Sequence, residues 1–283
     1  MAPPGLDVGV APLDPAFVYS HVGRREAEYG RPVRLDHPYA VVFTVEMDHR
    51  LVRSAPGLGT TVESSSRYLE AAKIALALSS VIRAWGYDAR PHLDGNYLAV
   101  LPPIAVTAGL GEVGRLGLLV TEECGPRVRL GAVTTDLPLV PDGPRPFGVQ
   151  EFCRVCLKCA RACPGRAIGR ERDAPPSGWG IRWEDCYRFW RKVGTDCAVC
   201  LDVCPYSKPR SGLHRLFRLA VRGSPLGPRA AVWLDDLLYG RRPRRRPEPG
   251  WLGLHGASRG GRRGSGGTLG RAEALEQHGV GET

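Results

Sequence analysis

Apolar residues follow two different patterns along the first half of the chain, and each pattern predicts a different element. Residues 39–47 form a nearly continuous apolar run, and residues 127–135 alternate between apolar and polar side chains. Both patterns are typical of strands, the first of a strand buried on both faces. Residues 67–85 instead repeat apolar side chains at helical spacing and are followed by Gly86, which favours a helix end. The pattern therefore predicts an α/β (α+β) domain.

Three serines, Ser64 to Ser66, precede this predicted helix and are favourable N-cap residues. They place the helix start near residue 67, after a predicted loop at residues 50–61. Tyr68 would then lie in the first turn, where the helix dipole favours a negatively charged phenolate. Tyrosines at such positions are more often packing residues, so the pattern by itself leaves the role of Tyr68 open.

Glycines punctuate the region between two further predicted strands, at residues 96–101 and 118–121. Gly109, Gly111 and Gly114 superficially satisfy the G-x-G-x-x-G pattern of dinucleotide sites, but they precede a strand instead of following one. The pattern therefore gives only weak support to a dinucleotide site. We expect these glycines to let the backbone pass close to a bulky ligand.

Cysteines dominate the next part of the chain, where eight of the nine fall in two groups of four that each end in Cys-Pro. The spacings are Cys-x2-Cys-x2-Cys-x3-Cys-Pro and Cys-x10-Cys-x2-Cys-x3-Cys-Pro. In two-cluster bacterial ferredoxins with such spacing, the fourth cysteine of a group binds the other group's cluster. We therefore predict one 4Fe-4S cluster on Cys153, Cys156, Cys159 and Cys204, and a second on Cys163, Cys186, Cys197 and Cys200.

Structural zinc and disulfides are the alternatives for these cysteines. Zinc sites also use Cys-x2-Cys pairs, but a third Cys-x2 step followed by x3-Cys-Pro is typical of iron–sulfur proteins. The sequence shows no run of eighteen apolar residues, no signal peptide and no twin-arginine motif, so we expect a cytoplasmic protein without a membrane span. Thiols stay reduced in the cytoplasm. Cys124, outside both groups, is interpreted as a buried structural thiol.

Charge and composition divide the rest of the chain. We expect an α/β domain at residues 1–145, a two-cluster module at 146–210 with a helix at 183–192, a helical segment at 211–252 and a disordered tail at 253–283. The net charge is +10, and residues 240–283 carry nine arginines against four glutamates. Such a basic tail could contact RNA, an acidic electron donor or only solvent; we do not favour a nucleic-acid partner.

Six short motifs occur in a fixed order along the chain. They are GYDAR at 86–90, AGLGEVGRLG at 108–117, GPRVRL at 125–130, TTDLPL at 134–139, FGVQEFC at 147–153 and DC at 196–197. Through these motifs residues 15–245 resemble the catalytic subunit of corrinoid-dependent reductive dehalogenases, with a shorter N-terminal portion.

The resemblance implies a nitroreductase-like cobalamin-binding domain followed by a ferredoxin-like module with two 4Fe-4S clusters. It also implies a reaction. Electrons from an external donor, such as ferredoxin, flavodoxin or a reductase, would pass through the clusters to the cobalt of a base-off cobalamin. The cobalt would remove halide from a small organohalide, and a tyrosine would donate the proton.

The same resemblance implies roles for individual residues. The family's tyrosine lies at the start of the helix that ends in Gly-Tyr-x-Ala, a position held by Tyr68, and its arginine partner in Gly-Pro-x-Val-Arg is matched by Arg129. Trp190, four residues after the first cysteine of the second group, matches a pocket tryptophan. A cation beside a phenol lowers its pKa and would stabilise the phenolate left after proton transfer. The candidate cofactor-binding residues are Asp94, Gly109, Gly111 and Gly114.

Two alternatives stay open. Epoxyqueuosine reductase is a related cobalamin and double-cluster enzyme that acts on tRNA, and the arginine-rich tail would suit phosphate contacts. The sequence around Asp94, HLDGN at 92–96, is however a poor fit to that family's catalytic aspartate motif. A non-catalytic iron–sulfur electron-transfer protein would need only the clusters, but it would not explain why Tyr68, Arg129 and Trp190 occur together.

Overall fold

The computed structural model describes residues 6–24, 26–171, 179–209, 212, 214, 221, 227–241, 243, 247 and 250–252. The tail predicted at 253–283 and, within the predicted helical segment at 211–252, residues 213, 215–220 and 222–226 therefore lie outside the described residues. The described residues up to 247 belong to one compact unit. The short 3-10 helix η4 (Gly250–Leu252) belongs to a second unit and is described only by itself.

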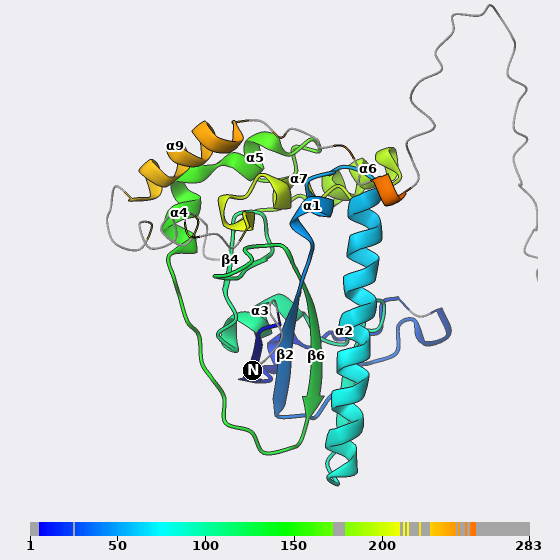
Figure 1. The fold of residues 1–283 in the computed structure, drawn as a ribbon. Coiled ribbons are helices and arrows are strands. Elements are labelled where there is room, and N and C mark those ends of the chain that lie inside the picture. The colour runs from blue at the N-terminus through cyan, green and yellow to red at the C-terminus, as the bar shows by residue number, and fades with distance from the viewer. Residues whose placement is uncertain are drawn as a thin grey trace, which may run out of the picture. The chain divides into compact units, whose positions relative to one another are not determined.

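A four-stranded antiparallel sheet forms the centre of the first unit (Figure 1). Its strand order is β1 (Val8–Pro12), β2 (Tyr39–Glu46), β6 (Val128–Thr135) and β3 (Ala89–His92). The two central strands pair over their whole length, from Tyr39 opposite Thr135 to Glu46 opposite Val128. The strands predicted at 39–47 and 127–135 are thus confirmed as the middle of the sheet.

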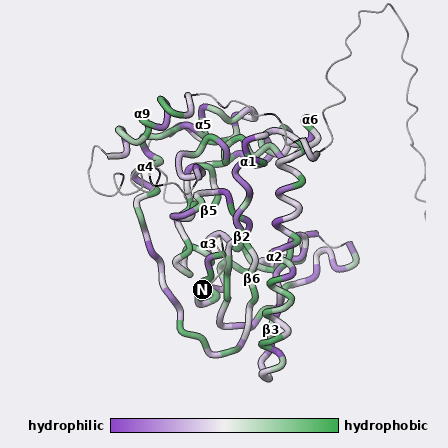
Figure 2. Tube along the Cα trace, in the orientation of Figure 1, coloured by the Kyte–Doolittle hydropathy of each residue, from purple (hydrophilic) through white to green (hydrophobic). Residues whose placement is uncertain are grey.

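Each face of the sheet is covered by a helix, α2 (Leu58–Ala84) on one side and α3 (Leu101–Thr107) on the other. The core under α2 contains Phe43, Val45, Ala71, Ala75, Ile82 and Val133. The core under α3 contains Ala40, Val42, Ile104, Ala105 and Ala132. Because alternate residues of β2 point to opposite faces, a strand between two helices must be apolar throughout. Figure 2 shows the resulting hydrophobic stretch along β2 and β6.

Helix α2 begins nine residues before the start at residue 67 that the serines predicted. The predicted loop at 50–61 is confirmed only at residues 53–57, because α1 (His49–Val52) and the first turn of α2 occupy the rest. Tertiary contacts extend the helix: the Glu63 carboxylate accepts from the Asp48 amide at 2.7 Å, and the Thr60 hydroxyl donates to the Leu51 carbonyl at 3.1 Å. Such contacts override weak local propensity. Tyr68 therefore lies about three turns into the helix, where the dipole argument does not apply.

Two shorter predicted strands fare differently. The strand predicted at 96–101 is wrong: only Ala99 pairs, in an isolated bridge with Val18, and Leu101 already begins α3. Prolines at the first helical positions fit helix geometry, which explains why α3 starts there. The strand predicted at 118–121 is present as β5 (Leu119–Val120), which pairs with β4 (Glu112–Val113).

The cysteine-rich region consists of short helices at one end of the sheet (Figure 1). They are α4 (Val149–Cys156), α5 (Lys158–Ala162), α6 (Trp183–Val193), α7 (Val199–Asp202), η3 (Pro205–Ser207) and α9 (Gly227–Tyr239). The helix predicted at 183–192 is confirmed as α6. One hydrophobic cluster joins this region to Met47, Val52 and Leu116. None of the described helices is both long and apolar enough to cross a membrane.

Candidate functional site

Four of the cysteines converge on one small cavity. Cys153 and Cys156 come from α4, Cys159 comes from α5, and Cys204 precedes η3. All four line a cavity of about 20 Å³. The structure thus brings Cys204 of the second group beside three cysteines of the first, which is the grouping that the spacing predicted.

The other four cysteines form a second set. Burial, together with the neighbouring thiolates of Cys197, Cys186 and Cys163, raises the pKa of the Cys200 thiol to about 12. Burial likewise raises the pKa of Cys197 to about 11, again with Cys163 and Cys186 as neighbours. Cys163, which follows α5, is thus an electrostatic neighbour of all three of these cysteines of the second group.

The donor chemistry of both sets fits iron–sulfur clusters. The eight cysteines are free thiols, without disulfides between them. Among the described residues, no three His, Cys, Asp or Glu side chains converge as the ligands of a single metal ion would. A 4Fe-4S cluster takes four cysteine thiolates, one on each iron. Burial raises the pKa of Cys204 to about 12, so bound iron is needed to hold its thiolate form.

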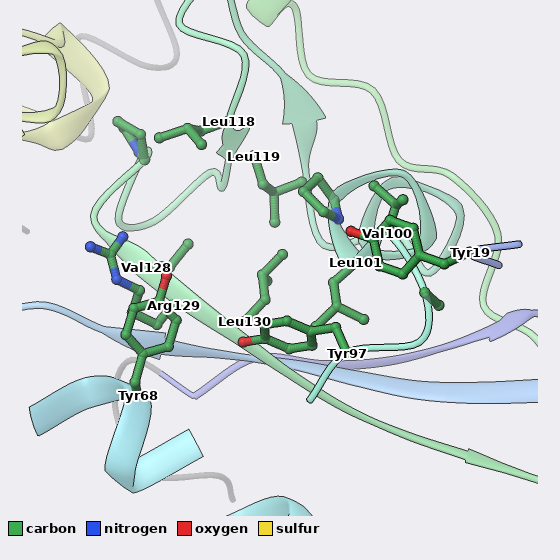
Figure 3. Close-up of a pocket in the computed structure, with 13 residues that line it drawn as sticks. Tyr19, Tyr68, Tyr97, Val100, Leu101, Leu118, Leu119, Val128, Arg129 and Leu130 are labelled. Atoms are coloured by element: carbon green, nitrogen blue, oxygen red, sulfur yellow. The ribbon is translucent and has the colours of Figure 1, made fainter. Parts of the chain in front are cut away.

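A second cavity, of about 200 Å³, lies beside β6 and the α2 helix (Figure 3). Its walls are mainly apolar, with three tyrosines and one arginine among them. The lining residues are Tyr19, Tyr68, Tyr97, Ala99, Val100, Leu101, Pro102, Leu118, Leu119, Pro126, Val128, Arg129 and Leu130. An apolar cavity with a few polar groups is typical of a small-molecule site.

Tyr68 and Arg129 lie against each other in this cavity. The guanidinium carbon of Arg129 is 4.9 Å from the centroid of the Tyr68 ring. Burial raises the pKa of the Tyr68 phenol, and the positive charge of Arg129 opposes that rise. The phenol is therefore protonated at neutral pH and has a cation beside it, which suits a proton donor.

The position of Arg129 is fixed by two further contacts. Its Nη2 donates to the Ser64 hydroxyl at 2.7 Å and lies 3.9 Å from the Asp196 carboxylate. Its Nε is buried and has no hydrogen-bond partner among the described residues. Ser64, predicted to cap a helix, instead lies inside α2 and holds Arg129.

The remaining predicted site residues lie elsewhere. Trp190 is on α6, 43% exposed, and does not line the cavity. Asp94 is exposed and forms an ion pair with Arg24 at 3.4 Å. The three glycines pack against the chain itself: a Cβ would lie 2.6 Å from the Gly143 carbonyl oxygen at Gly109, 2.3 Å from the Val120 carbonyl oxygen at Gly111, and 2.8 Å from a Val120 methyl at Gly114.

Sequence reasoning missed Tyr19 and Tyr97. Both come from irregular segments, where no periodicity marks a position as facing inward. Tyr97 is close enough to Tyr68 that burial and the Tyr68 phenolate together raise its pKa. Asp196 was part of the motif DC at 196–197, which could have suggested a role for its carboxylate.

The apolar cavity adjoins both cysteine sets. Leu118 and Leu119 line it, while Leu116 and Val120 of the same segment line the cavity of the first cysteine set. Asp196, which contacts Arg129, directly precedes Cys197 of the second set. Short segments of the chain therefore connect both cysteine sets to the cavity that holds Tyr68 and Arg129.

Comparison with known proteins identifies what this arrangement resembles. No protein-family model matches the chain. The tetrachloroethene reductive dehalogenase of Desulfitobacterium hafniense is 38% identical over 210 residues, which are 69% of this chain and 38% of that protein. A solved catabolic reductive dehalogenase in complex with 3-bromo-4-hydroxybenzoic acid is 29% identical, with a TM-score of 0.74 over 83% of this chain and 34% of that one. The chain is a relative of the reductive dehalogenases.

The predicted resemblance to reductive dehalogenases is thus confirmed. Another solved reductive dehalogenase, described as suggesting a mechanism for B12-dependent dehalogenation, has a TM-score of 0.74, 29% identity and coverage of 84% of this chain and 35% of that one. Epoxyqueuosine reductase of Lactococcus garvieae is more distant, at 32% identity over 130 residues, or 41% of this chain and 36% of that protein. This chain spans about two-fifths of the length of the dehalogenase relative from Desulfitobacterium.

Proposed function

We propose that this chain carries out reductive dehalogenation with two 4Fe-4S clusters and a cobalamin. An organohalide, two electrons and one proton would give the dehalogenated product and a halide ion, so that a carbon–halogen bond breaks and a carbon–hydrogen bond forms. The observation that carries the proposal is the contact of protonated Tyr68 with Arg129 in an apolar cavity flanked by two cysteine sets.

Each part of the chain has a proposed task. Residues 146–210 would be the ferredoxin-type module, with one cluster on Cys153, Cys156, Cys159 and Cys204 and the other on Cys163, Cys186, Cys197 and Cys200. Residues 1–145 would be the nitroreductase-like, cobalamin-binding part. When bound, the clusters supply one-electron transfer and the cobalamin supplies the cobalt centre for carbon–halogen cleavage. An external donor such as ferredoxin, flavodoxin or a reductase would provide the electrons.

The size of the apolar cavity limits how much of a bound cofactor or substrate the described residues can contact. A cavity of about 200 Å³ is smaller than the roughly 300–1,000 Å³ of sites that enclose a drug-sized ligand. A corrinoid is larger than such a ligand, so the described walls would cover only part of it. The cavity is nevertheless large enough for the reacting end of a small organohalide such as a halophenol. Tyr68 and Arg129 would therefore serve the reacting side of the site.

Tyr68 would deliver the proton to the substrate, and its neighbours in the cavity would stabilise the phenolate that remains. Burial keeps the Tyr68 phenol protonated until substrate is reduced. After proton transfer the phenolate would be stabilised by Arg129, whose side chain is held by Ser64 and Asp196. The apolar residues around them exclude water, which strengthens this electrostatic interaction.

The test compares two tyrosines of one cavity. After anaerobic reconstitution, Tyr68→Phe should retain iron and cobalamin but lose about 10²- to 10⁴-fold in halide release from halophenols, as expected when a general acid is removed. Tyr97→Phe is the matched control, because Tyr97 lines the same cavity, and it should stay within a few-fold of wild type.

Three outcomes would contradict the proposal. Unchanged halide release from Tyr68→Phe would remove this tyrosine from the reaction. Protein that holds iron but no cobalt would instead support an iron–sulfur electron-transfer protein. Turnover of epoxyqueuosine-containing tRNA without halide release would support the tRNA-modifying alternative.

A further inference from the structure

Two arginines, Arg115 and Arg127, are the largest fully buried side chains among the described residues, each about 1% exposed. Their environments differ. Arg127 forms an ion pair with Glu46 at 3.1 Å, so its charge is balanced. No described carboxylate lies within ion-pair distance of Arg115. Burial of a cation costs free energy, and no ion pair with a described carboxylate offsets that cost for Arg115.

The guanidinium of Arg115 is satisfied by carbonyl oxygens alone. Its Nε and Nη2 donate to the Cys153 carbonyl at 3.0 and 2.9 Å, and its Nη1 donates to the carbonyls of Gly169 and Glu171 at 3.1 and 2.6 Å. The ring of Trp179 lies 3.9 Å from the guanidinium carbon. These neutral partners hold the side chain in place, and the described carboxylate that acts on its charge, that of Glu171, does so without forming an ion pair.

This charge lies at the first cysteine set. Arg115 lines the same cavity as Cys153, Cys156, Cys159 and Cys204. Its backbone amide points at the Cys153 sulfur, with the nitrogen 3.5 Å from Sγ. The motif AGLGEVGRLG supports this placement, because Gly114 packs against Val120 where a side chain would clash.

Two other buried cations, Lys158 and Lys208, lie next to these cysteines, and Lys208 donates to the Asp202 carbonyl at 2.8 Å. Lys158, between Cys156 and Cys159 in the sequence, forms ion pairs with Asp235 and Asp236 of α9. Near the second set, Asp196 precedes Cys197, and its carboxylate lies 3.9 Å from the Arg129 guanidinium. Arg115 therefore gives the first set an electrostatic environment that the second set does not share.

We propose that Arg115 raises the reduction potential of the cluster held by Cys153, Cys156, Cys159 and Cys204 relative to that of the second cluster. The proposal rests on the iron–sulfur assignment in the proposed function. One-electron reduction adds a negative charge to the cluster, and a fixed positive charge nearby stabilises the reduced form. Arg115 is thus a positioning residue that sets the relative potentials of the two clusters.

The test replaces Arg115 with a neutral and with a charged residue. Both variants and wild type are reconstituted without oxygen and titrated with titanium(III) citrate under EPR detection. Cys186→Ala, which should lose the second cluster, identifies the signal of the first. Arg115→Gln should lower the reduction equilibrium constant of the first cluster about tenfold, or 59 mV for one electron, and leave the second unchanged. Arg115→Lys should keep the wild-type potential.

A second measurement guards against a variant that fails to hold iron. Trp179→Ala keeps Arg115 but lets water screen its charge, so the potential of the first cluster should fall in the same direction and by less. The proposal would be overturned if the potential of the first cluster were unchanged in both Arg115→Gln and Trp179→Ala. Equal shifts in Arg115→Gln and Arg115→Lys would also overturn it, because lost packing would then be the cause. Wild type that binds no iron would instead refute the proposed function.

Discussion

The protonation of Tyr68 is set by two opposing effects at the scale of single residues. Burial in the apolar cavity raises the pKa of its phenol, whereas the cation of Arg129 lowers it, and burial has the larger effect. A proton donor is competent only while protonated, so activity that depends on Tyr68 should be present below its pKa and lost as the pH rises through it.

Removal of the Arg129 charge should therefore raise the pKa of Tyr68 further. Arg129→Gln keeps a hydrogen-bonding side chain opposite Ser64 and removes the cation. The measurement is a spectroscopic titration of tyrosinate, in which the curve of the matching Tyr68→Phe protein is subtracted in each background. Arg145→Gln, which removes an exposed arginine outside the cavity lining, is the control and should leave the curve in place. A lower pKa of Tyr68 in Arg129→Gln would show that the positive charge of Arg129 does not control the titration of the phenol.

The structure brings together some of the residues that the sequence singled out, but Trp190 and the three glycines, which came from the same family resemblance, do not line the apolar cavity. The crossed grouping of Cys204 with Cys153 followed from ferredoxin spacing, and Tyr68 with Arg129 followed from family motifs. Tyr97 could not be found in this way, because an irregular segment gives no pattern that says which side chains face a cavity. The prediction that Tyr68 lies in the first helical turn was wrong for a related reason. The start of α2 depends on the contact of Glu63 with Asp48, and local sequence patterns do not reveal such a tertiary contact.

At the scale of elements, the long strands were predictable because burial on both faces leaves a strong apolar signal. The prediction of a strand at 96–101 was wrong because a short apolar segment before two prolines is compatible with a strand and equally with the approach to a helix such as α3. The register between β2 and β6 was not predictable at all. It places Gly131 opposite Phe43, so that the aromatic ring lies over the glycine.

This register gives a stability prediction. A Cβ at Gly131 would lie 2.4 Å from the Phe43 ring, which is buried and cannot move aside. Gly131→Ala should therefore destabilise the protein by about 1–3 kcal/mol, the usual effect of overpacking a core. Urea denaturation of the reconstituted protein measures this. Gly180→Ala is the control, because nothing lies within 4 Å of its added Cβ. Equal stability of the two variants would mean that the sheet accommodates the methyl group.

At the scale of the whole compact unit, one buried lysine joins the C-terminal helix to the first cysteine set. Lys158 of α5 forms ion pairs with Asp235 and Asp236 and donates to the Gly240 carbonyl at 3.1 Å. Burial by itself lowers the pKa of Lys158, but the two carboxylates outweigh it and raise the pKa. Because Lys158 stands between Cys156 and Cys159, the attachment of α9 and the protection of the cluster site depend on the same side chain.

Lys158→Met should therefore both destabilise the protein and expose the first cluster. Loss of one partner leaves Asp235 buried and unpaired, which costs about 3–5 kcal/mol, whereas removal of both partners of a buried pair is often neutral. Lys158→Met should lose iron to oxygen faster than wild type and unfold at lower urea concentration, and the double variant with Asp235→Leu should recover much of both losses. The opposite outcome is a double variant that is no more stable than Lys158→Met and loses iron just as fast. The unpaired charge of Asp235 would then not be the cause, and Lys158 would act through its packing and its contacts with Asp236 and Gly240.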